Sequence, residues 1–323
     1  MAAVDAFTLT APLTDPAAAR RELFAHPELL WGHLAPDLEP GRDYASHSMA
    51  GTGGAGRIQT VAPDRIGFTW GSAGWRRPGR FIVRIGGELA VEAEDVPRAH
   101  AAGARAHWER MLTSAAGYLN QPNPSLDAPV RAVLFDADGV LQLPRAGWLD
   151  ELTRIGGPTF VEDAFRAELE CLTGADLRPR LEALLAAGTG AHVDEVLGAW
   201  HEIDIDDESL ALVGRLRRSG LLVGLATNQQ SYRGAQMRSR YGIDRHFDHV
   251  FYSYELGHAK PSAEFYGHIV AALGLPAGEI AFVDDSAANV RGARAAGLRS
   301  ALHRASTGAA GLASDLIAIG VPV

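Results

Sequence analysis

The chain has 323 residues, of which 47% are hydrophobic and 21% are charged, and its formal net charge is −9. This composition is typical of a globular protein long enough for two domains, and the negative charge argues against a nucleic-acid or anionic-membrane partner. The single cysteine, Cys171, excludes an intrachain disulfide. The sequence shows neither a secretory signal nor an apolar stretch near the roughly 20 residues of a membrane span, so we expect a cytoplasmic protein.

Apolar residues alternate with polar ones in the first third of the chain, which predicts strands with one apolar face. Gly and Pro clusters between them favour antiparallel hairpins or meanders. The glycine-rich residues 51–56 lack the Lys-Ser/Thr of a phosphate-binding loop and predict a hairpin turn. An amphipathic helix is predicted from about residue 97 to 119, so the sheet is expected to curl around it. The three alternating sets are Ile66, Phe68 and Trp70; Phe81, Val83 and Ile85; and Leu89, Val91 and Ala93.

Several short segments of this part match a known pattern: Leu30-Trp31, Pro40-Gly41, residues 53–56, residues 61–70 and the closing helix with Trp108. On these segments, about residues 5–120 resemble the START-like (SRPBCC) domains, in particular the relatives of the heat-shock-protein ATPase activators. The resemblance implies an α+β helix-grip domain, and such domains often enclose an apolar ligand. In the alternative interpretation the tryptophans, Trp70, Trp75 and Trp108, only fill a core.

The pattern changes after a Pro- and Asn-rich segment, residues 120–129, which predicts an interdomain linker. Short apolar runs without alternation now predict strands buried on both faces, with helical patterns between them. This order predicts an α/β fold with a doubly wound parallel sheet. The runs are residues 130–135, 221–226, 249–252 and 279–283.

A long insert, about residues 145–205, separates the first two runs and is too long for an ordinary crossover. It predicts a bundle of helices set over the sheet, near residues 148–154, 161–172, 177–187 and 192–200. Some of its side chains are conceivable substrate contacts, although solvated arginines and a packed tryptophan are the simpler interpretation: Arg145, Trp148, Arg154 and Arg166.

Two aspartates, Asp136 and Asp138, directly follow the first apolar run, and Gly139 comes next. Residues two apart can project to the same side of an extended segment, and glycine lets the backbone turn sharply beside them. One carboxylate can then attack a substrate while the other moves a proton, with a cation nearby. Taken alone, the motif also fits a solvated acidic turn.

Three further segments lie where predicted strands end, which is where ligands bind in such sheets. Thr227 and Asn228 follow the second run and offer a hydroxyl, an amide and backbone N–H groups. Lys260 brings a positive charge just before a helix that opens at Pro261. The last segment carries the carboxylates of Asp284 and Asp285 and the amide of Asn289.

Together these segments resemble the four motifs of the haloacid dehalogenase (HAD) superfamily, over about residues 130–304, with the insert in the place of its helical cap. The last motif, Val-Asp-Asp-Ser-Ala-Ala-Asn, is similar to that of the phosphatases that include the N-terminal domain of soluble epoxide hydrolases. The resemblance implies a two-domain fusion. Its parts are a START-like domain (1–122), a linker (123–129), a catalytic core (130–144 and 205–323) and a cap (145–204).

The resemblance also implies a role for each motif residue. Asp136 would be the nucleophile and a metal ligand, and Asp138 the general acid and base, with its backbone carbonyl on the metal. HAD dehalogenases lack an acid at the position of Asp138, because a carbon–halogen bond needs no leaving-group proton. The remaining roles are Asp285 as metal ligand, Thr227, Asn228 and Lys260 as holders of the phosphoryl oxygens, and Asp284 and Asn289 as supporting residues.

We therefore expect a Mg²⁺-dependent phosphatase that hydrolyses a small phosphorylated metabolite through an aspartyl-phosphate, since Mg²⁺ suits an all-oxygen site. A phosphomutase with the same four motifs is one alternative. The other is an apolar-ligand-binding or co-chaperone protein whose N-terminal domain carries the main function. The substrate and the oligomeric state cannot be read from the sequence.

Overall fold

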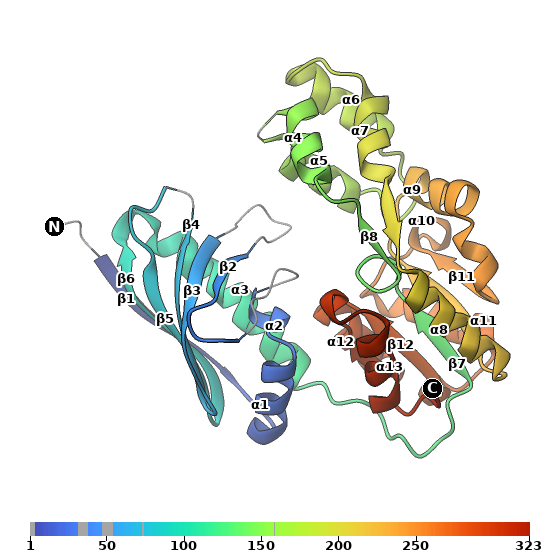
Figure 1. Ribbon diagram of the computed structural model, residues 1–323, viewed down its shortest axis with the longest axis horizontal. Coiled ribbons are helices and arrows are strands. Elements are labelled where there is room, and N and C mark those ends of the chain that lie inside the picture. Colours follow the sequence, from blue (N-terminus) through green and yellow to red (C-terminus); the bar gives the residue numbers. More distant parts are fainter. Residues whose placement is uncertain (1–3, 32–37, 47–53, 73, 158) are drawn as a thin grey trace. The chain divides into compact units, whose positions relative to one another are not determined.

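The computed structural model describes residues 4–31, 38–46, 54–72, 74–157 and 159–323. The chain divides into two compact units, residues 1–122 and 123–323 (Figure 1). Within the described ranges, no helix is both long enough and apolar enough to cross a membrane.

The first unit is built on a six-stranded antiparallel sheet with the order β1-β6-β5-β4-β3-β2. The three predicted strands correspond to β4, β5 and β6, whereas β1, β2 and β3 were not predicted. The long helix begins at Ala101, four residues later than predicted, because a 3₁₀ turn follows β6. The elements are β1 (Val4–Pro12), α1 (Pro16–Ala25), α2 (Glu28–Trp31), β2 (Asp43–Ser46), β3 (Gly54–Ala62), β4 (Arg65–Ser72), β5 (Gly79–Ile85), β6 (Glu88–Pro97) and α3 (Ala101–Leu119).

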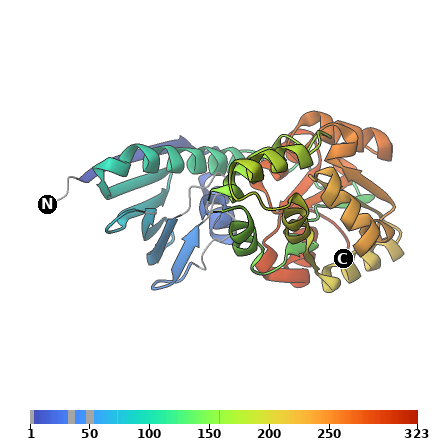
Figure 2. The same ribbon diagram turned by 90° about the horizontal axis from the view of Figure 1, so that it is seen from above.

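Helix α3 lies along one face of this sheet (Figures 1 and 2). Aromatic rings pack between the helix and the sheet. The ring of Trp108 on α3 lies 5.3 Å from Phe68 on β4 and 6.5 Å from Trp31 on α2, between centroids. These rings are almost fully buried. The core of the first unit is therefore an aromatic cluster held between one helix and one sheet face.

The predicted hairpin turn over residues 51–56 is wrong for its second half. Gly54 and Gly56 lie inside β3, and a Cβ on Gly56 would come within 1.8 Å of the carbonyl oxygen of Thr69 on β4. The glycine is therefore needed for close strand approach rather than for a turn. Residues 51–53 lie outside the described residues.

The second unit contains the predicted parallel sheet, with the order β11-β10-β7-β12-β13, which confirms the α/β core. Four strands match the predicted runs within two residues, and only β13 was missed. Helices α8 and α13 pack on one face, and α11 and α12 on the other. The elements are β7 (Ala132–Phe135), α8 (Asp207–Arg218), β10 (Leu222–Thr227), α9 (Ser231–Gln236), β11 (His249–Tyr252), α10 (Ser253–Leu256), α11 (Ala263–Leu273), β12 (Ile280–Asp284), α12 (Ala287–Ala295), β13 (Arg299–Leu302) and α13 (Gly308–Ala318).

Four helices form the insert, close to the predicted positions, and we call them the cap. The chain leaves the core through β8 (Gln142–Pro144) and returns through β9 (Ile203–Ile205), which pair antiparallel (Figure 1). The cap has its own hydrophobic core, centred on residues such as Leu152, Leu181 and Trp200. Its helices are α4 (Trp148–Gly156), α5 (Phe160–Leu169), α6 (Arg178–Ala187) and α7 (Val193–His201).

Candidate active site

The four motifs meet at one edge of the parallel sheet. Phe135 on β7 pairs with Leu225 on β10 and with Val283 on β12, so the three strands end level with one another. Asp136, Thr227 and Asp284 therefore lie side by side at the carboxyl edge, where open α/β sheets bind ligands.

Lys260 lies at the centre of this edge. Its ammonium Nζ is 2.8 Å from an oxygen of Asp136 and 2.6 Å from an oxygen of Asp284, and its residue is only 4% exposed. The backbone around it is held by Asn228, whose side chain accepts from the N–H of Lys260 at 2.8 Å and donates to its carbonyl at 2.9 Å. The lysine is thus fixed from both its side chain and its main chain.

Burial shapes the electrostatics of this trio. Loss of water raises the pKa of Asp136 to about 7, although the charge of Lys260 opposes the shift. Burial also raises the pKa of Asp284. Burial alone would lower the pKa of Lys260, but the charges of the two aspartates outweigh it and the pKa is raised. Two buried carboxylates thus share one ammonium, and the centre favours further positive charge.

Asn289 supports Asp284 directly. Its side-chain amide donates to both carboxylate oxygens of Asp284, at 3.0 and 3.1 Å, and the N–H of Ser286 donates to the same carboxylate at 2.8 Å. Asp284 is completely buried, so these donors offset part of its lost hydration. Asn289 is therefore a structural partner of the site.

Three carboxylates could hold a metal ion. One oxygen each of Asp136, Asp284 and Asp285 lies within 4.8 Å of the others. Gly139 makes the close approach of Asp285 possible, because its φ is +77° and a Cβ on it would lie 2.1 Å from Oδ2 of Asp285. An all-oxygen donor set of this charge suits a hard divalent cation such as Mg²⁺.

The side chain of Asp138 points to a different set of groups. Its Oδ1 accepts from Arg233 at 2.5 Å and from the amide of Gln142 at 3.0 Å, and its Oδ2 accepts from the amide of Gln229 at 2.6 Å. Gln229 and Arg233 were missed at the sequence level. They follow the Thr227-Asn228 motif closely, which is the only signal that could have singled them out.

The residues expected to hold phosphoryl oxygens differ in what their side chains contact. Thr227 is buried, and its hydroxyl accepts from the amide of Gln229 at 3.3 Å. The side chain of Asn228 is engaged with the backbone of Lys260. Lys260 alone of the three brings a charge to the centre.

The cap side chains named as conceivable substrate contacts have partners within the cap or at its base. Arg145 pairs with Glu202, Arg154 with Glu151, and the ring of Trp148 packs edge-on against Phe165. Arg166 likewise pairs with Glu162 and Asp163. Another cap residue, Glu168 on α5, is more closely tied to the site: burial raises its pKa to about 7, and the charges of Arg233 and Asp138 act on it in opposite directions.

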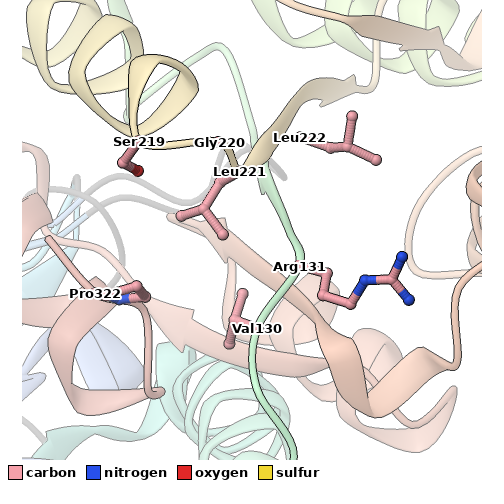
Figure 3. Close-up of a pocket in the computed structure, with 7 residues that line it drawn as sticks. All are labelled: Val130, Arg131, Ser219, Gly220, Leu221, Leu222 and Pro322. Atoms are coloured by element: carbon pink, nitrogen blue, oxygen red, sulfur yellow. The ribbon is translucent and has the colours of Figure 1, made fainter.

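A pocket of about 440 Å³ lies elsewhere, at the opposite edge of the sheet. It is lined by Val130 and Arg131 before β7, by residues 219–222 at the start of β10, and by Pro322 near the end of the chain. Figure 3 shows Leu221 and Val130 pointing toward one another there, while Arg131 extends away. None of its lining residues belongs to the motifs, so this pocket is not the candidate site.

Comparison with known proteins finds a family, a curated relative and solved structures to which this chain is similar. The sequence model of the haloacid dehalogenase-like hydrolases matches residues 130–297. A sesquiterpene phosphatase of Aspergillus oryzae is 33% identical over 93 residues, which is 29% of this chain and 47% of the relative. The chain thus spans about half the length of this curated relative.

Solved structures with a similar fold are also found. A HAD-family enzyme of Bacteroides thetaiotaomicron is 22% identical, covers 55% of this chain and 95% of its own, and has a TM-score of 0.47. A HAD-like hydrolase of Porphyromonas gingivalis is 23% identical, with coverages of 54% and 91% and a TM-score of 0.48. The L-2-haloacid dehalogenase of Xanthobacter autotrophicus is 19% identical, with coverages of 60% and 85% and a TM-score of 0.43.

Proposed function

Since the chain belongs to the haloacid dehalogenase-like hydrolases, we propose that this hydrolase is a phosphatase acting on a small phosphorylated metabolite. The observation that carries the proposal is the carboxylate of Asp138, two residues after Asp136 and held by three donors. An alkoxide leaving group needs a proton, whereas a halide does not. The sesquiterpene phosphatase among the relatives supports the same choice of reaction.

In the proposed reaction Asp136 attacks the phosphorus atom, and the bond from phosphorus to the ester oxygen breaks. Asp138 gives its proton to that oxygen, and the alcohol leaves. Asp138, now a carboxylate, takes a proton from water as the water attacks the aspartyl-phosphate. Inorganic phosphate is released and Asp136 is regenerated. Splitting the hydrolysis into two transfers is the usual covalent solution to a slow reaction.

Lys260 supplies the fixed positive charge that the transferring phosphoryl group needs. Its ammonium contacts Asp136 directly, so a phosphoryl group on that carboxylate would lie within its reach. Thr227 would add a hydroxyl donor. Asn228 and Asp284 would act by orienting Lys260, and Asn289 by holding Asp284.

The donor set also fits Mg²⁺, with Asp136 and Asp285 as side-chain ligands and the backbone carbonyl of Asp138 as a third. Three clustered carboxylates with one ammonium leave an excess of negative charge, which a divalent cation would neutralise. When bound, the cation would neutralise the phosphoryl oxygens and the nucleophile as they approach.

For the first unit we infer a START-like helix-grip domain. The six-stranded antiparallel sheet and the long helix α3 on its face support this inference. An apolar ligand or a protein partner of this unit remains a prediction from the resemblance.

The test is phosphate release from a panel of phosphomonoesters that includes sugar phosphates, prenyl phosphates and an aryl phosphate, with and without Mg²⁺. We expect release of inorganic phosphate that needs Mg²⁺ and is absent in Asp136→Asn. Isomerised sugar phosphate without release would favour the phosphomutase instead. If no ester on the panel is turned over, the proposal fails.

A further inference from the structure

Arg233 joins the cap to the proposed general acid. It lies on α9, a core helix that follows the Thr227-Asn228 motif, and Figure 1 shows α9 next to the end of α7. One guanidinium nitrogen donates to Oδ1 of Asp138 at 2.5 Å, and another donates to the carbonyl of Trp200 at 2.8 Å. Trp200 lies in the last turn of α7, directly before the chain leaves the cap through β9.

The contact with Trp200 is favourable for two reasons. The last carbonyls of a helix have no partner within the helix, and the negative end of the helix dipole attracts a cation. The guanidinium is also planar and rigid, so its two bonds are made in a fixed relation to each other. A shift of the end of α7 therefore either breaks the bond to Trp200 or moves the nitrogen that donates to Asp138.

Stability alone does not explain an arginine at this position. The side chain is 5% exposed, and among the described residues its Nε has no hydrogen-bond partner. Burying a guanidinium with an unpaired donor costs free energy that an apolar side chain of similar size would avoid. Its charge also acts on two cap residues, Glu168 and His201.

We propose that Arg233 is a positioning residue that holds the Asp138 carboxylate in a fixed position relative to the cap. The orientation of Asp138 then depends on the position of the cap. This inference rests on the proposed phosphatase function for its catalytic meaning. Gln142, at the start of β8, and Gln229, after β10, also donate to Asp138, but Arg233 is the member of this group that also bonds to a cap helix among the described residues. The proposal differs from a direct role because Arg233 acts on substrate only through Asp138.

A double-mutant cycle tests this dependence. Arg233→Met removes the charge and the bonds to Asp138 and Trp200 while keeping a side chain of similar length. Arg233→Lys keeps the charge but has no planar group that could make both bonds. With an alkyl phosphate, whose alkoxide leaving group needs a proton, and Mg²⁺, we expect Arg233→Met to lower kcat by about 30-fold or more, within the usual range for a misplaced general acid. In an Asp138→Asn background the same change should cost less than about threefold. Equal losses in both backgrounds would overturn the proposal.

Tyr232→Phe is the matched control. Tyr232 neighbours Arg233 on α9, and its hydroxyl donates to Asp176 of the cap segment at 3.0 Å. The donors that reach the Asp138 carboxylate among the described residues are Gln142, Gln229 and Arg233. The Tyr232→Phe substitution removes a bond between the core and the cap but leaves the contacts of Asp138 in place. We therefore expect kcat to stay within about twofold of wild type. A loss as large as that of Arg233→Met would mean that cap attachment in general, rather than Arg233, is what matters.

Hydrogen exchange gives a readout that needs no activity. Arg233→Met and Arg233→Lys should speed exchange both at residues 138–144 and at residues 196–205, by about fivefold or more, because one link between them is lost. Tyr232→Phe should leave residues 138–144 unchanged. If the wild-type protein released no phosphate from any ester, the phosphatase proposal would fail while this measurement still decided the link. Unchanged exchange around Asp138 in both arginine variants would overturn it.

Discussion

Asp136 is the residue on which the covalent mechanism depends most directly. Asp136→Asn is nearly isosteric and keeps one oxygen for Lys260, but an amide is a far weaker nucleophile at phosphorus. We expect phosphate release to fall by at least about a thousandfold, as for other removed nucleophiles, with the melting temperature little changed. Steady-state assays measure phosphate release, and circular dichroism measures the melting temperature. Wild-type turnover in a folded variant would contradict the assignment.

Lys260 contributes to both the chemistry and the stability of the sheet edge. Lys260→Met leaves Asp136 and Asp284 buried without their ammonium. Removing one partner of a buried ion pair costs about 3–5 kcal/mol, so we expect a loss of unfolding free energy of that order in urea titrations, together with loss of phosphate release. The control is Arg154→Met, which removes an exposed pair with Glu151 and should change neither property measurably. An unchanged urea midpoint in Lys260→Met would argue that the ammonium does not hold the two carboxylates.

His107 gives the first unit a dependence on acidity. Burial, and then the charge of Arg110, lower its pKa to about 4 from an ordinary value near 6.5, and its ring stacks on Trp70 at 5.1 Å. The unfolded chain binds a proton on His107 more readily than the folded one does, so acid favours unfolding. His107 leaves the free energy of unfolding undiminished above pH 6.5, and lowers it as the pH falls toward 4. A shift of this size amounts to at most about 3 kcal/mol.

The matched variant is His107→Phe, which keeps an aromatic ring on Trp70 but cannot titrate. We expect the melting temperature of the wild type to fall more than that of the variant between pH 7 and pH 4.5, measured by calorimetry. His201 in the cap has its pKa lowered to about 4 by burial and by Arg233, so it contributes equally to both proteins. Identical pH dependence in the two would show that His107 does not stay neutral in the fold.

Individual motif residues could be predicted because their chemistry is local. Asp136, Asp138 and Asp284 stand at the ends of recognisable strands, and parallel strands bring their carboxyl ends to one edge. The bonds of Asn228 to the backbone of Lys260 could not be predicted, because they join residues 32 positions apart. Arg233 was missed for the same reason, because its contact with Asp138 joins residues 95 positions apart.

At the scale of elements, strands with a strong apolar pattern were predicted and weak ones were not. β4, β5 and β6 alternate clearly, since one face of each packs on α3 and the aromatic cluster. β1 is mostly exposed and has little apolar contrast. β13 begins with Arg299, whose burial depends on its donation to the carbonyl of Ala128, far away in the sequence.

The turn after β7 provides a prediction at this scale. Gly139 and Gly147 both have positive φ, +77° and +81°, so alanine is strained at either position. A Cβ on Gly139 would lie 2.1 Å from Oδ2 of Asp285, whereas a Cβ on Gly147 would meet nothing within 4 Å. Comparing Gly139→Ala with Gly147→Ala therefore separates the displacement of Asp285 from backbone strain.

We expect Gly139→Ala to weaken Mg²⁺-dependent phosphate release by about tenfold or more and to raise the Mg²⁺ concentration needed for half activity, as when a metal ligand loses its orientation. Gly147→Ala should lose a similar amount of stability with an unchanged Mg²⁺ requirement. Titration of activity against Mg²⁺ measures the Mg²⁺ requirement of each variant, and thermal unfolding measures its stability. An equal Mg²⁺ requirement in the two variants would exclude Asp285 as a ligand.

The whole molecule is a chain of two units with separate hydrophobic cores. The first is an aromatic cluster under an antiparallel sheet, and the second is an aliphatic core on both faces of a parallel sheet, with a third core in the cap. The change from alternating to continuous apolar runs in the sequence predicted this difference, because a sheet with one covered face and a sheet with two need different strand patterns. We expect each unit to fold by itself.

A fragment of residues 123–323 should therefore fold and hydrolyse an aryl phosphate at nearly the rate of the full chain, whereas residues 1–122 should fold without activity. The starting residue matters, because Asn123 accepts from the backbone N–H of Ser300 at 2.7 Å and the carbonyl of Ala128 accepts from the buried Arg299. A fragment of residues 129–323 loses both acceptors and leaves a buried guanidinium less satisfied, so it should unfold at a lower temperature by several degrees. Thermal unfolding and phosphate release of the two fragments test this. Equal melting temperatures would show that residues 123–128 act only as a tether, and an inactive 123–323 fragment would mean that the first unit is needed to complete the enzyme.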